Sequence, residues 1–275
     1  MMAKLQAKLC RAAVYAGAAF SVSVLVLIVG YILIKGMPHL SPELFAWEYN
    51  STNVSMMPAI INTLLMTLLS LLVCVPLGIG AAIWLTEYAP RGSRLVKLVR
   101  MTAETLSGIP SIIYGLFGSL FFVVALKMGL SLLSGALTLS IMVLPTIMRT
   151  TEEALLAVPD SYREGSFGLG AGRLRTTFKV VLPSAVPGIL SGVIPAIGRI
   201  VGETAALIYT AGTVAKVPDT LLDSTRTLAV HMYTISTEGL YIDQSYATAV
   251  VLLVMVLLIN SLSALIAKRV GGKHA

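Results

Sequence analysis

The chain has 275 residues, of which 56% are apolar and 12% are charged, and its formal net charge is +7. Soluble domains average about 25% charged residues, so this composition excludes an ordinary soluble enzyme or binding domain. The basic residues lie in short segments beside long apolar runs rather than in one patch with interleaved aromatic residues, which argues against a nucleic-acid partner. We therefore expect an all-α membrane protein with a single transmembrane domain, residues 1–275.

Six apolar runs are long enough to form membrane-spanning helices, because a helix needs about 20 mostly apolar residues to cross a bilayer. In chain order they cover residues 12–34, 59–86, 106–126, 130–149, 187–211 and 246–267. Lys127 and the small residues around Gly135 make the third and fourth runs the weakest. The first run is longer than the core of a signal peptide and no cleavage pattern follows it, so we expect an uncleaved anchor.

The lysines and arginines predict the orientation of these helices, because cytoplasmic loops are enriched in basic residues. If the N-terminus is cytoplasmic, the inside segments, including Arg91 and Lys273, hold fifteen basic residues and the outside segments hold four. Both termini are therefore predicted to be cytoplasmic. Two outside loops are long, residues 36–58 and 212–245, and the second is expected to contain a short surface or re-entrant helix. Each loop could be a packed cap or a docking surface.

Motifs for nucleotide hydrolysis are absent from this sequence. No G-x-x-x-x-G-K-[ST] phosphate-binding loop occurs, and the Gly-rich segment 168–173 lacks the lysine that such a loop requires. The three histidines and two cysteines do not have the spacing of a metal site. We therefore expect no catalytic residue, metal or cofactor in this chain. If it moves a solute against a gradient, ion coupling or a partner ATPase must supply the energy.

A long polar segment, residues 150–186, separates the fourth and fifth runs. Ser161 and Glu164 have the spacing of a capping box, which predicts a helix that starts beside them. The glycines in 168–172 are expected to end this helix, and a second, amphipathic helix should follow and stop near Pro183. Such a helix pair could lie on anionic lipid or fit a groove of another protein.

Two charged residues, Arg199 and Glu203, lie inside the fifth apolar run, in the segment GRIVGETAAL at 198–207. An ionised residue at the centre of a bilayer costs at least about 2.5–3.5 kcal/mol on insertion scales. The i, i+4 spacing places both residues on one helical face, where they could form a structural ion pair. The alternative is a solute path, with Thr204 as a weaker candidate, because intramembrane charges commonly mark such paths.

An arginine beside a glutamate suits one class of solute. The guanidinium group can donate two parallel hydrogen bonds to a tetrahedral oxyanion. Glu203 would repel a dianion without a proton, such as sulfate, but could accept a hydrogen bond from hydrogen phosphate. If the pair lines a path, its chemistry therefore favours phosphate.

The segment 164–183 resembles the EAA motif of ABC-importer permeases, which reads Glu-Ala-Ala, three residues, Gly, nine residues and Ile-x-Leu-Pro. Here Glu164 is followed at the same spacing by Gly170, Leu182 and Pro183, with Gly and Ser in place of the two alanines. In that family the loop docks into a cleft of the ATPase subunit. The resemblance implies that these four residues belong to an ATPase-coupling loop.

The segment GRIVGETAAL is similar to the R-x-x-G-E-T-A segment of the phosphate-importer permeases, and the layout of six spans resembles their PstA-type subunits. The resemblance implies a type I ABC importer fold in the bacterial inner membrane, with Arg199, Glu203 and Thr204 on the substrate path. It implies as partners a PstC-type permease, two copies of a PstB-type ATPase that bind ATP, and an extracytoplasmic phosphate-binding protein. A permease for molybdate or sulfate and an ion-coupled anion transporter remain the alternatives.

Overall fold

The computed structural model describes residues 2–90 and 92–271, so Arg91 and Lys273 lie outside the described residues. Within these ranges every regular element is a helix, as expected. The α-helices are α1 (Met2–Gly36), α2 (Met57–Ile83), α3 (Arg94–Ser107), α4 (Ser111–Gly118), α5 (Leu132–Leu156), α6 (Asp160–Gly168), α7 (Arg173–Thr176), α8 (Leu182–Val201), α9 (Ala205–Thr210), α10 (Leu228–Glu238) and α11 (Ile242–Gly271). Short 3-10 segments are η1 (Met37–His39) and η2 (Pro42–Phe45), and π-helical segments are η3 (Trp84–Tyr88), η4 (Ser119–Ala125) and η5 (Thr177–Val181).

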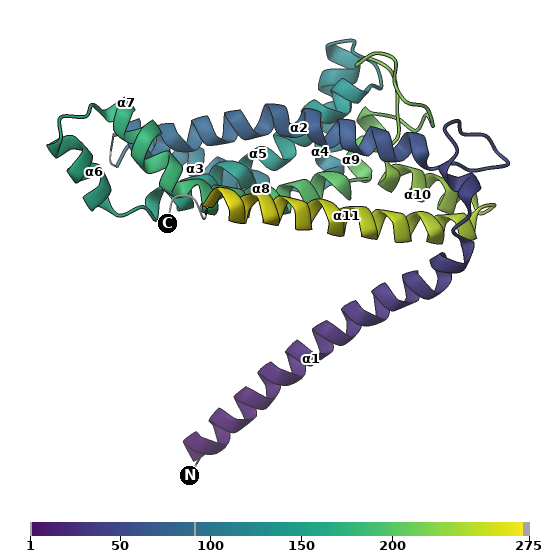
Figure 1. The fold of residues 1–275 in the computed structure, drawn as a ribbon, viewed down its shortest axis with the longest axis horizontal. Coiled ribbons are helices and arrows are strands. Elements are labelled where there is room, and N and C mark those ends of the chain that lie inside the picture. Colours follow the sequence, from purple (N-terminus) through teal and green to yellow (C-terminus); the bar gives the residue numbers. More distant parts are fainter. Residues whose placement is uncertain (1, 91, 272–275) are drawn as a thin grey trace.

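The long helices α2, α5, α8 and α11 run along the bundle, and α1 diverges from it at one end (Figure 1). α6 and α7 lie at one end of the bundle, and α10 lies at the other (Figure 1). We call these the α6 end and the α10 end. The described part of α11 finishes toward the α6 end. The polar segment 150–186, which contains α6, and the helix α10 within 212–245 therefore lie at opposite ends of the bundle (Figure 1).

Five of the six predicted spans correspond to helices that are long and apolar enough to cross a membrane, and the remaining one corresponds to a bent pair. In that pair, α3 meets the helical run Ser111–Ala125 at 103°. The predicted start of this span, residue 106, is therefore wrong. Pro110 disfavours a helical conformation in the residue before it, so α3 ends and α4 starts after the proline. The helix expected within 212–245 is present as α10.

The expected stop near Pro183 does not occur, because α7, η5 and α8 form one continuous run from Arg173 to Val201. A proline ring normally clashes with the carbonyl four residues earlier, which here belongs to Lys179. Lys179 lies in the π-helical segment η5, whose wider turn accommodates the ring. The loop and the fifth span are therefore mechanically joined rather than separated by a break.

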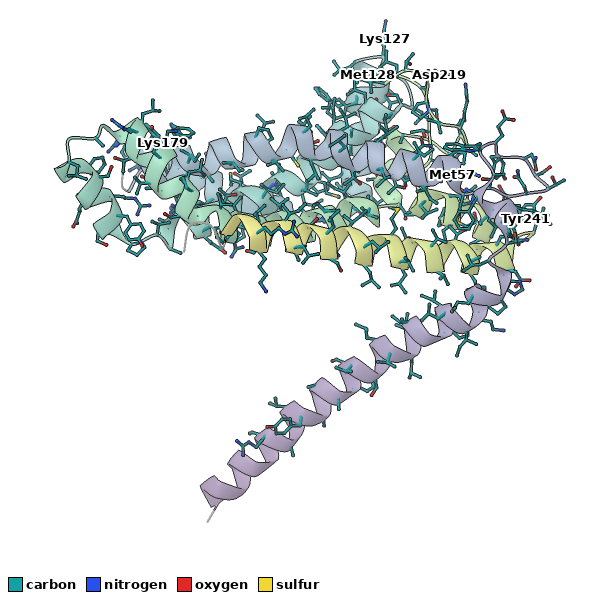
Figure 2. The ribbon with its side chains drawn as sticks, viewed as in Figure 1. Met57, Lys127, Met128, Lys179, Asp219 and Tyr241 are labelled. Carbon is teal, nitrogen blue, oxygen red and sulfur yellow. The ribbon has the colours of Figure 1, made fainter. Side chains whose placement is uncertain are left out.

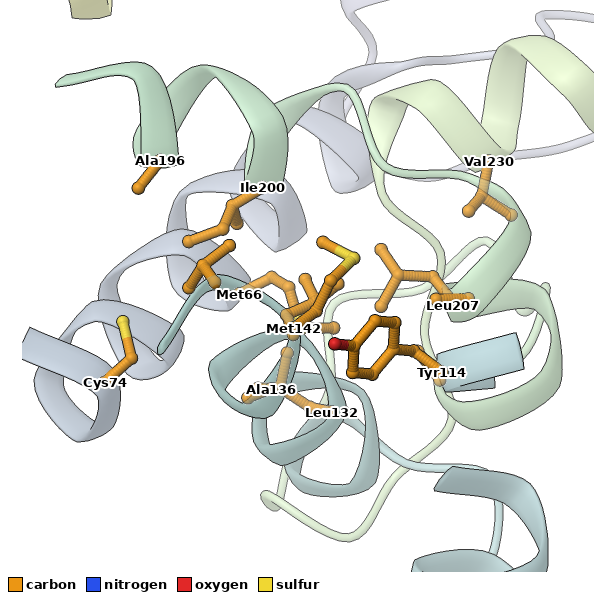
Figure 3. Packing of buried hydrophobic residues seen from close by; sticks show 14 of the residues in the cluster. Met66, Cys74, Tyr114, Leu132, Ala136, Met142, Ala196, Ile200, Leu207 and Val230 are labelled. Carbon is orange, nitrogen blue, oxygen red and sulfur yellow. The ribbon is translucent and has the colours of Figure 1, made fainter. Parts of the chain in front are cut away.

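The main core forms where α5 faces α2, α8, α4 and α9. Met66, Met142, Ile200 and Leu207 come from four different helices and converge there (Figure 3). Lipid is as apolar as these side chains, so close packing rather than exclusion of water holds membrane helices together. Gly192 of α8 lies so near α5 that an added Cβ would clash with Thr150. Small residues thus set the close approach of α8 to the core helix.

Helix α1 contacts the bundle only toward its C-terminal end, where it meets α11 (Figure 1). Figure 2 shows the rest of the described helix standing apart from the other elements. At the contact, a Cβ added to Gly36 would clash with the backbone carbonyl of Tyr246 and with the Val250 side chain. Gly36 therefore determines how closely α1 can join α11.

We expect Gly36→Ala to displace α1 from α11, because the Tyr246 carbonyl belongs to a rigid helix and cannot yield as a flexible side chain would. The predicted result is a lower thermal unfolding temperature of the purified protein and faster proteolysis near residues 36–40. Gly30→Ala is the matched control, since no atom lies within 4 Å of its added Cβ. Equal behaviour of the two variants would contradict the packing role of Gly36.

Candidate functional site

The predicted solute-path residues lie where α8 ends. α8 stops at Val201 and α9 starts at Ala205, so the helical ladder is interrupted between Arg199 and Glu203. The single helical face expected for the pair therefore does not form. The segments remain next to one another, but the two side chains have different surroundings. Interrupted helices in membranes place polar backbone groups where protein or a water-lined cavity can satisfy them.

Glu203 has a structural contact that explains the interruption. Its Oε1 accepts a hydrogen bond from the backbone N–H of Ala206 at 3.0 Å, and the residue is only 8% exposed. The carboxylate thus caps the first turn of α9, where a negative charge is favoured by the helix dipole. Among the described residues no ion pair joins it to Arg199, so the structural ion pair is not observed.

Arg199 is partly buried in the last turn of α8. Within the described ranges it makes no ion pair and no side-chain hydrogen bond. Thr204 is also partly buried, and its Oγ1 donates to the Gly202 carbonyl across 3.5 Å, a long hydrogen bond. The break therefore presents a cation and a hydroxyl whose hydrogen-bonding capacity is largely unused.

Asn260 of α11 is a further polar residue that the sequence analysis missed. Its amide lies next to Gly198, where an added Cβ would stand 3.7 Å from Nδ2 and 3.8 Å from Oδ1. The buried Oδ1 atom has no hydrogen-bond partner among the described residues. The signal in the sequence was a lone asparagine within the apolar run 246–267. The structure thus places a second polar side chain beside the turn that carries Arg199.

The predicted coupling loop occupies the α6 end. Glu164 is exposed on α6, and Gly170 lies in the turn after it with φ of +81°. Leu182 and Pro183 lie farther along, in the first turn of α8. The capping box predicted for Ser161 and Glu164 is not formed, because α6 already begins at Asp160. The four motif residues are therefore spread over a helix, a turn and the base of α8.

Arg163, which precedes the motif, makes the most extensive polar contacts of this loop. Its Nη2 lies 2.7 Å from Glu87 Oε1, and Nη2 and Nη1 also donate to the carbonyls of Leu155 at 2.9 Å and Val158 at 2.8 Å. The side chains of Arg163 and Glu87 are only 16% and 9% exposed. One arginine thus ties α6 to the end of α5 and to η3, which continues α2.

The surface beside this ion pair is hollow. A cavity of about 770 Å³ lies between α6, α7 and the end of η3, and Arg163, Phe167 and Glu87 contribute to its lining. Arg173 stands over the Tyr88 ring at 5.9 Å across the same cavity. The contact between α6 and the bundle is therefore carried by a few polar groups rather than by a packed apolar interface.

The coupling loop and the break at Arg199 do not meet, but α8 connects them. About 17 residues separate Leu182 from Arg199, which corresponds to about 25 Å of helix. Since η5 and α8 are continuous, a displacement of the loop would move the base of the same helix that carries Arg199. The geometry allows a mechanical link between the two regions.

We expect Gly170→Ala to destabilise the turn between α6 and α7 by about 1–2 kcal/mol, because a residue with a Cβ is strained at this positive φ. The measurable result is a lower thermal unfolding temperature. Gly165→Ala, inside α6 with no atom within 4 Å of the added Cβ, is the matched control. It should stabilise the helix by about 0.5–1 kcal/mol. A stabilising effect of both variants would contradict the conformational role of Gly170.

Residues 74–272 match the family model described as binding-protein-dependent transport system inner membrane component. The chain belongs to this family. It is therefore the permease subunit of an ABC importer, an inner-membrane component with several apolar helices. In this family the permease is the non-catalytic subunit, and the ATPase activity resides on a partner.

Several curated proteins are similar to this permease. A probable ABC transporter permease protein of Bacillus subtilis, YqgI, is 34% identical over 266 residues, covering 88% of each chain. The phosphate transport system permease protein PstC of Mesorhizobium japonicum is 30% identical, covering 83% of this chain and 78% of that protein. The phosphate transport system permease protein PstA 2 of Mycobacterium bovis is 42% identical, and the match covers 56% of this chain and half of that protein.

Solved structures confirm the fold of this permease. A chain of the MetNI methionine ABC transporter in an inward-facing conformation matches with a TM-score of 0.60 at 22% identity, covering 78% of this chain and 94% of that one. A chain of a bacterial alginate ABC transporter, solved with a periplasmic protein bound to an alginate pentasaccharide, gives a TM-score of 0.63 at 18% identity and covers 92% and 95%. The type I ABC importer permease fold is thereby confirmed.

Proposed function

We propose that this permease is the PstA-type subunit of an ATP-driven importer of inorganic phosphate. The observation that carries the proposal is Arg199, a cation without an ion-pair partner among the described residues, at a helix break inside the membrane domain. The relatives named as phosphate transport permeases support the choice of cargo. In this proposal the chain forms half of the path and a PstC-type permease forms the other half.

The energy enters through the α6 end. This end and both termini face the cytoplasm, as the basic residues indicate, and α6 docks on a PstB-type ATPase through Glu164 and the turn at Gly170. Two copies of that ATPase bind ATP, and the permease itself binds no cofactor. Closure of the ATPase pair moves the loop, and the continuous run η5–α8 carries this movement to Arg199. An extracytoplasmic phosphate-binding protein delivers the cargo at the α10 end.

At the break, the residues have separate roles. Arg199 donates two hydrogen bonds to the oxyanion, and Thr204 contributes a hydroxyl. Glu203 holds the break open by capping α9 through Oε1, while its Oε2 has no hydrogen bond among the described residues. That oxygen can accept the proton of hydrogen phosphate, which sulfate at neutral pH lacks. Binding must be weak, because a tight site would slow release of the cargo.

Two other functions compete with this proposal. A permease for molybdate or sulfate would keep the same partners and change only the cargo. An ion-coupled anion transporter would use Arg199 without an ATPase, but membership of the ABC importer family makes an ATPase partner the expectation. The likeness to the methionine and alginate transporters concerns the fold alone, since the identities are 22% and 18%.

The deciding experiment is uptake by proteoliposomes that contain both permeases and the ATPase, with the binding protein added outside. Labelled phosphate, sulfate and molybdate are offered separately, with ATP or a non-hydrolysable analogue inside. The proposal expects ATP-dependent uptake of phosphate alone. Uptake of another oxyanion would show that phosphate is the wrong cargo. Uptake that follows an ion gradient without ATP would refute the proposed energy source.

A further inference from the structure

A second buried polar cluster lies at the α10 end, on elements other than α8, which carries Arg199. It consists of Arg226, Thr227 and His231 at the start of α10 and Asn62 in the first turns of α2. All four residues are at least nine-tenths buried, with exposed fractions of 4%, 1%, 0% and 0%. Charged and polar groups are costly to bury unless they are paired, so this cluster requires an explanation.

Arg226 has unused donors on one edge of its guanidinium group. Nε and Nη2 are buried and have no hydrogen-bond partner among the described residues. Together these two atoms form the edge that binds an oxyanion through two parallel hydrogen bonds. The ring of Tyr49 lies 4.5 Å from Arg226 Cζ, which is a stacking contact over the flat face of the group. Stacking therefore leaves the hydrogen-bonding edge unused.

No carboxylate among the described residues neutralises Arg226. In the loop that precedes it, Asp219 pairs with Lys216 at 2.5 Å. Asp223 accepts hydrogen bonds from the backbone N–H groups of Asp219 and Thr220, both at 2.9 Å. The acids of this loop are thus engaged elsewhere, and the buried guanidinium remains an uncompensated positive charge. Such a charge costs several kcal/mol in a dry interior unless an anion accompanies it.

The groups around Arg226 are equally unused. Both ring nitrogens of His231, the Thr227 hydroxyl and Asn62 Oδ1 are buried without partners in the described part of the chain. Burial, and secondarily the positive charge of Arg226, lower the pKa of His231 to about 3, so the imidazole stays neutral and offers one donor. Asn62 Nδ2 donates to the Arg226 carbonyl at 3.1 Å and to the Lys216 carbonyl at 2.9 Å, which fixes the backbone beside the cluster.

The secondary structure adds to the positive potential. Thr227 is the N-cap of α10, an 11-residue helix, and its side chain makes no capping hydrogen bond. The N-terminus of a helix favours negative charge. His231 lies one turn into the same helix, and its ring stands 6.0 Å from the Tyr49 ring in an edge-on arrangement. Arg226 and His231 therefore both lie next to one aromatic side chain at a helix N-terminus.

We propose that Arg226, Thr227, His231 and Asn62 form an outer binding site for an inorganic oxyanion, which the cargo occupies before it reaches Arg199. Arg226 donates from its free edge, Thr227 and His231 add donors, and Asn62 Oδ1 accepts the proton of hydrogen phosphate. Tyr49, in the segment between α1 and α2, closes the site by stacking on Arg226. The assignment of phosphate, but not the oxyanion class, rests on the proposed function.

The test measures stabilisation by a ligand, because a molecule that binds only the folded state raises its unfolding temperature. The complete complex of both permeases and the ATPase is placed in nanodiscs without the binding protein, and every variant carries Arg199→Gln so that the path site does not respond. Inorganic phosphate is titrated against unfolding temperature. Arg226→Lys is compared with its parent because lysine keeps the charge but lacks the planar fork. Lys216→Gln is the control for loss of a basic residue in the same loop.

We expect phosphate to raise the unfolding temperature of the parent and of the Lys216→Gln complex. With Arg226→Lys, the phosphate concentration needed for the same rise should be roughly 10- to 100-fold higher, because one or two charge-assisted hydrogen bonds are lost. If Arg226 only supports the Tyr49 ring by packing, Arg226→Lys lowers the unfolding temperature without changing its dependence on phosphate. That result overturns the proposal. A site filled by a lipid phosphate or by water gives no response to free phosphate, which also overturns it. If the transported oxyanion proves to be sulfate or molybdate, an Arg226-dependent response to that anion upholds the site and refutes only the phosphate cargo.

Discussion

Arg199→Gln is expected to reduce phosphate uptake roughly 10- to 100-fold while the complex still assembles, because a charge-assisted hydrogen bond contributes about 1.5–3 kcal/mol and tenfold corresponds to about 1.4 kcal/mol. Arg199 has no ion-pair partner among the described residues, so its removal leaves no orphaned carboxylate. Stability should therefore change little. The measurement is initial uptake rate in proteoliposomes, with co-purification of the ATPase to verify assembly.

Glu203→Gln is the matched variant for this experiment. The amide oxygen of glutamine can still accept the hydrogen bond from Ala206, so the cap on α9 is largely kept while the charge is lost. Normal phosphate uptake with unchanged discrimination against sulfate would limit Glu203 to capping. Reduced discrimination would place its charge on the path. Normal uptake by Arg199→Gln itself would remove Arg199 from the path and leave the cargo assignment without structural support.

Arg163→Met is expected to separate ATP hydrolysis from uptake. Removing one partner of a buried ion pair typically costs about 3–5 kcal/mol, because the other charge is left unpaired. Here Glu87 would be left nearly buried at the end of η3, and the carbonyls of Leu155 and Val158 would lose their donor. α6 would then move independently of α2 and α5. The measurement is the ratio of phosphate imported to ATP hydrolysed, which should fall severalfold.

Two controls make this prediction specific. Arg163→Lys retains the charge but cannot reach Glu87 and both carbonyls at once, so an intermediate ratio is expected. Arg149→Met removes an ion pair with Glu153 in which the two side chains are 58% and 63% exposed. It should leave the free energy of unfolding within about 0.5 kcal/mol of the parent. An unchanged transport ratio in Arg163→Met would mean that α6 transmits movement through η5 and α8 alone.

Together with the polar cluster around Arg226, these contacts place three arginines at different positions along the helix bundle. Arg226 lies at the α10 end, Arg199 at the break between α8 and α9, and Arg163 at the α6 end. Among the described residues, Arg226 Nε and Nη2 have no partner and Arg199 makes no side-chain hydrogen bond, whereas Arg163 donates to several protein acceptors. This difference in bonding is why we propose a cargo role for the first two and a mechanical role for the third.

The sequence by itself determined the fold class, five of the six predicted spans, and the location of the polar loop between the fourth and fifth predicted spans. These follow from the lengths of apolar runs, which the thickness of a bilayer makes decisive. The spacing from Glu164 to Pro183 and the segment at 198–207 indicated the family, which the match over residues 74–272 confirmed. Local patterns were sufficient for these conclusions because each depends on neighbouring residues along the chain.

Only the tertiary structure decided how the charged residues are used. Helical spacing predicted that Arg199 and Glu203 share a face, but a backbone N–H of α9 competes for the carboxylate and the helix breaks. Pro183 was expected to stop a helix, but the wider turn of the π-helical segment η5 leaves room for its ring. The Glu87 contact of Arg163 spans 76 residues, and the Asn62 contact of Arg226 spans 164. Such pairings depend on which helices meet in space, and no periodicity along the chain encodes them.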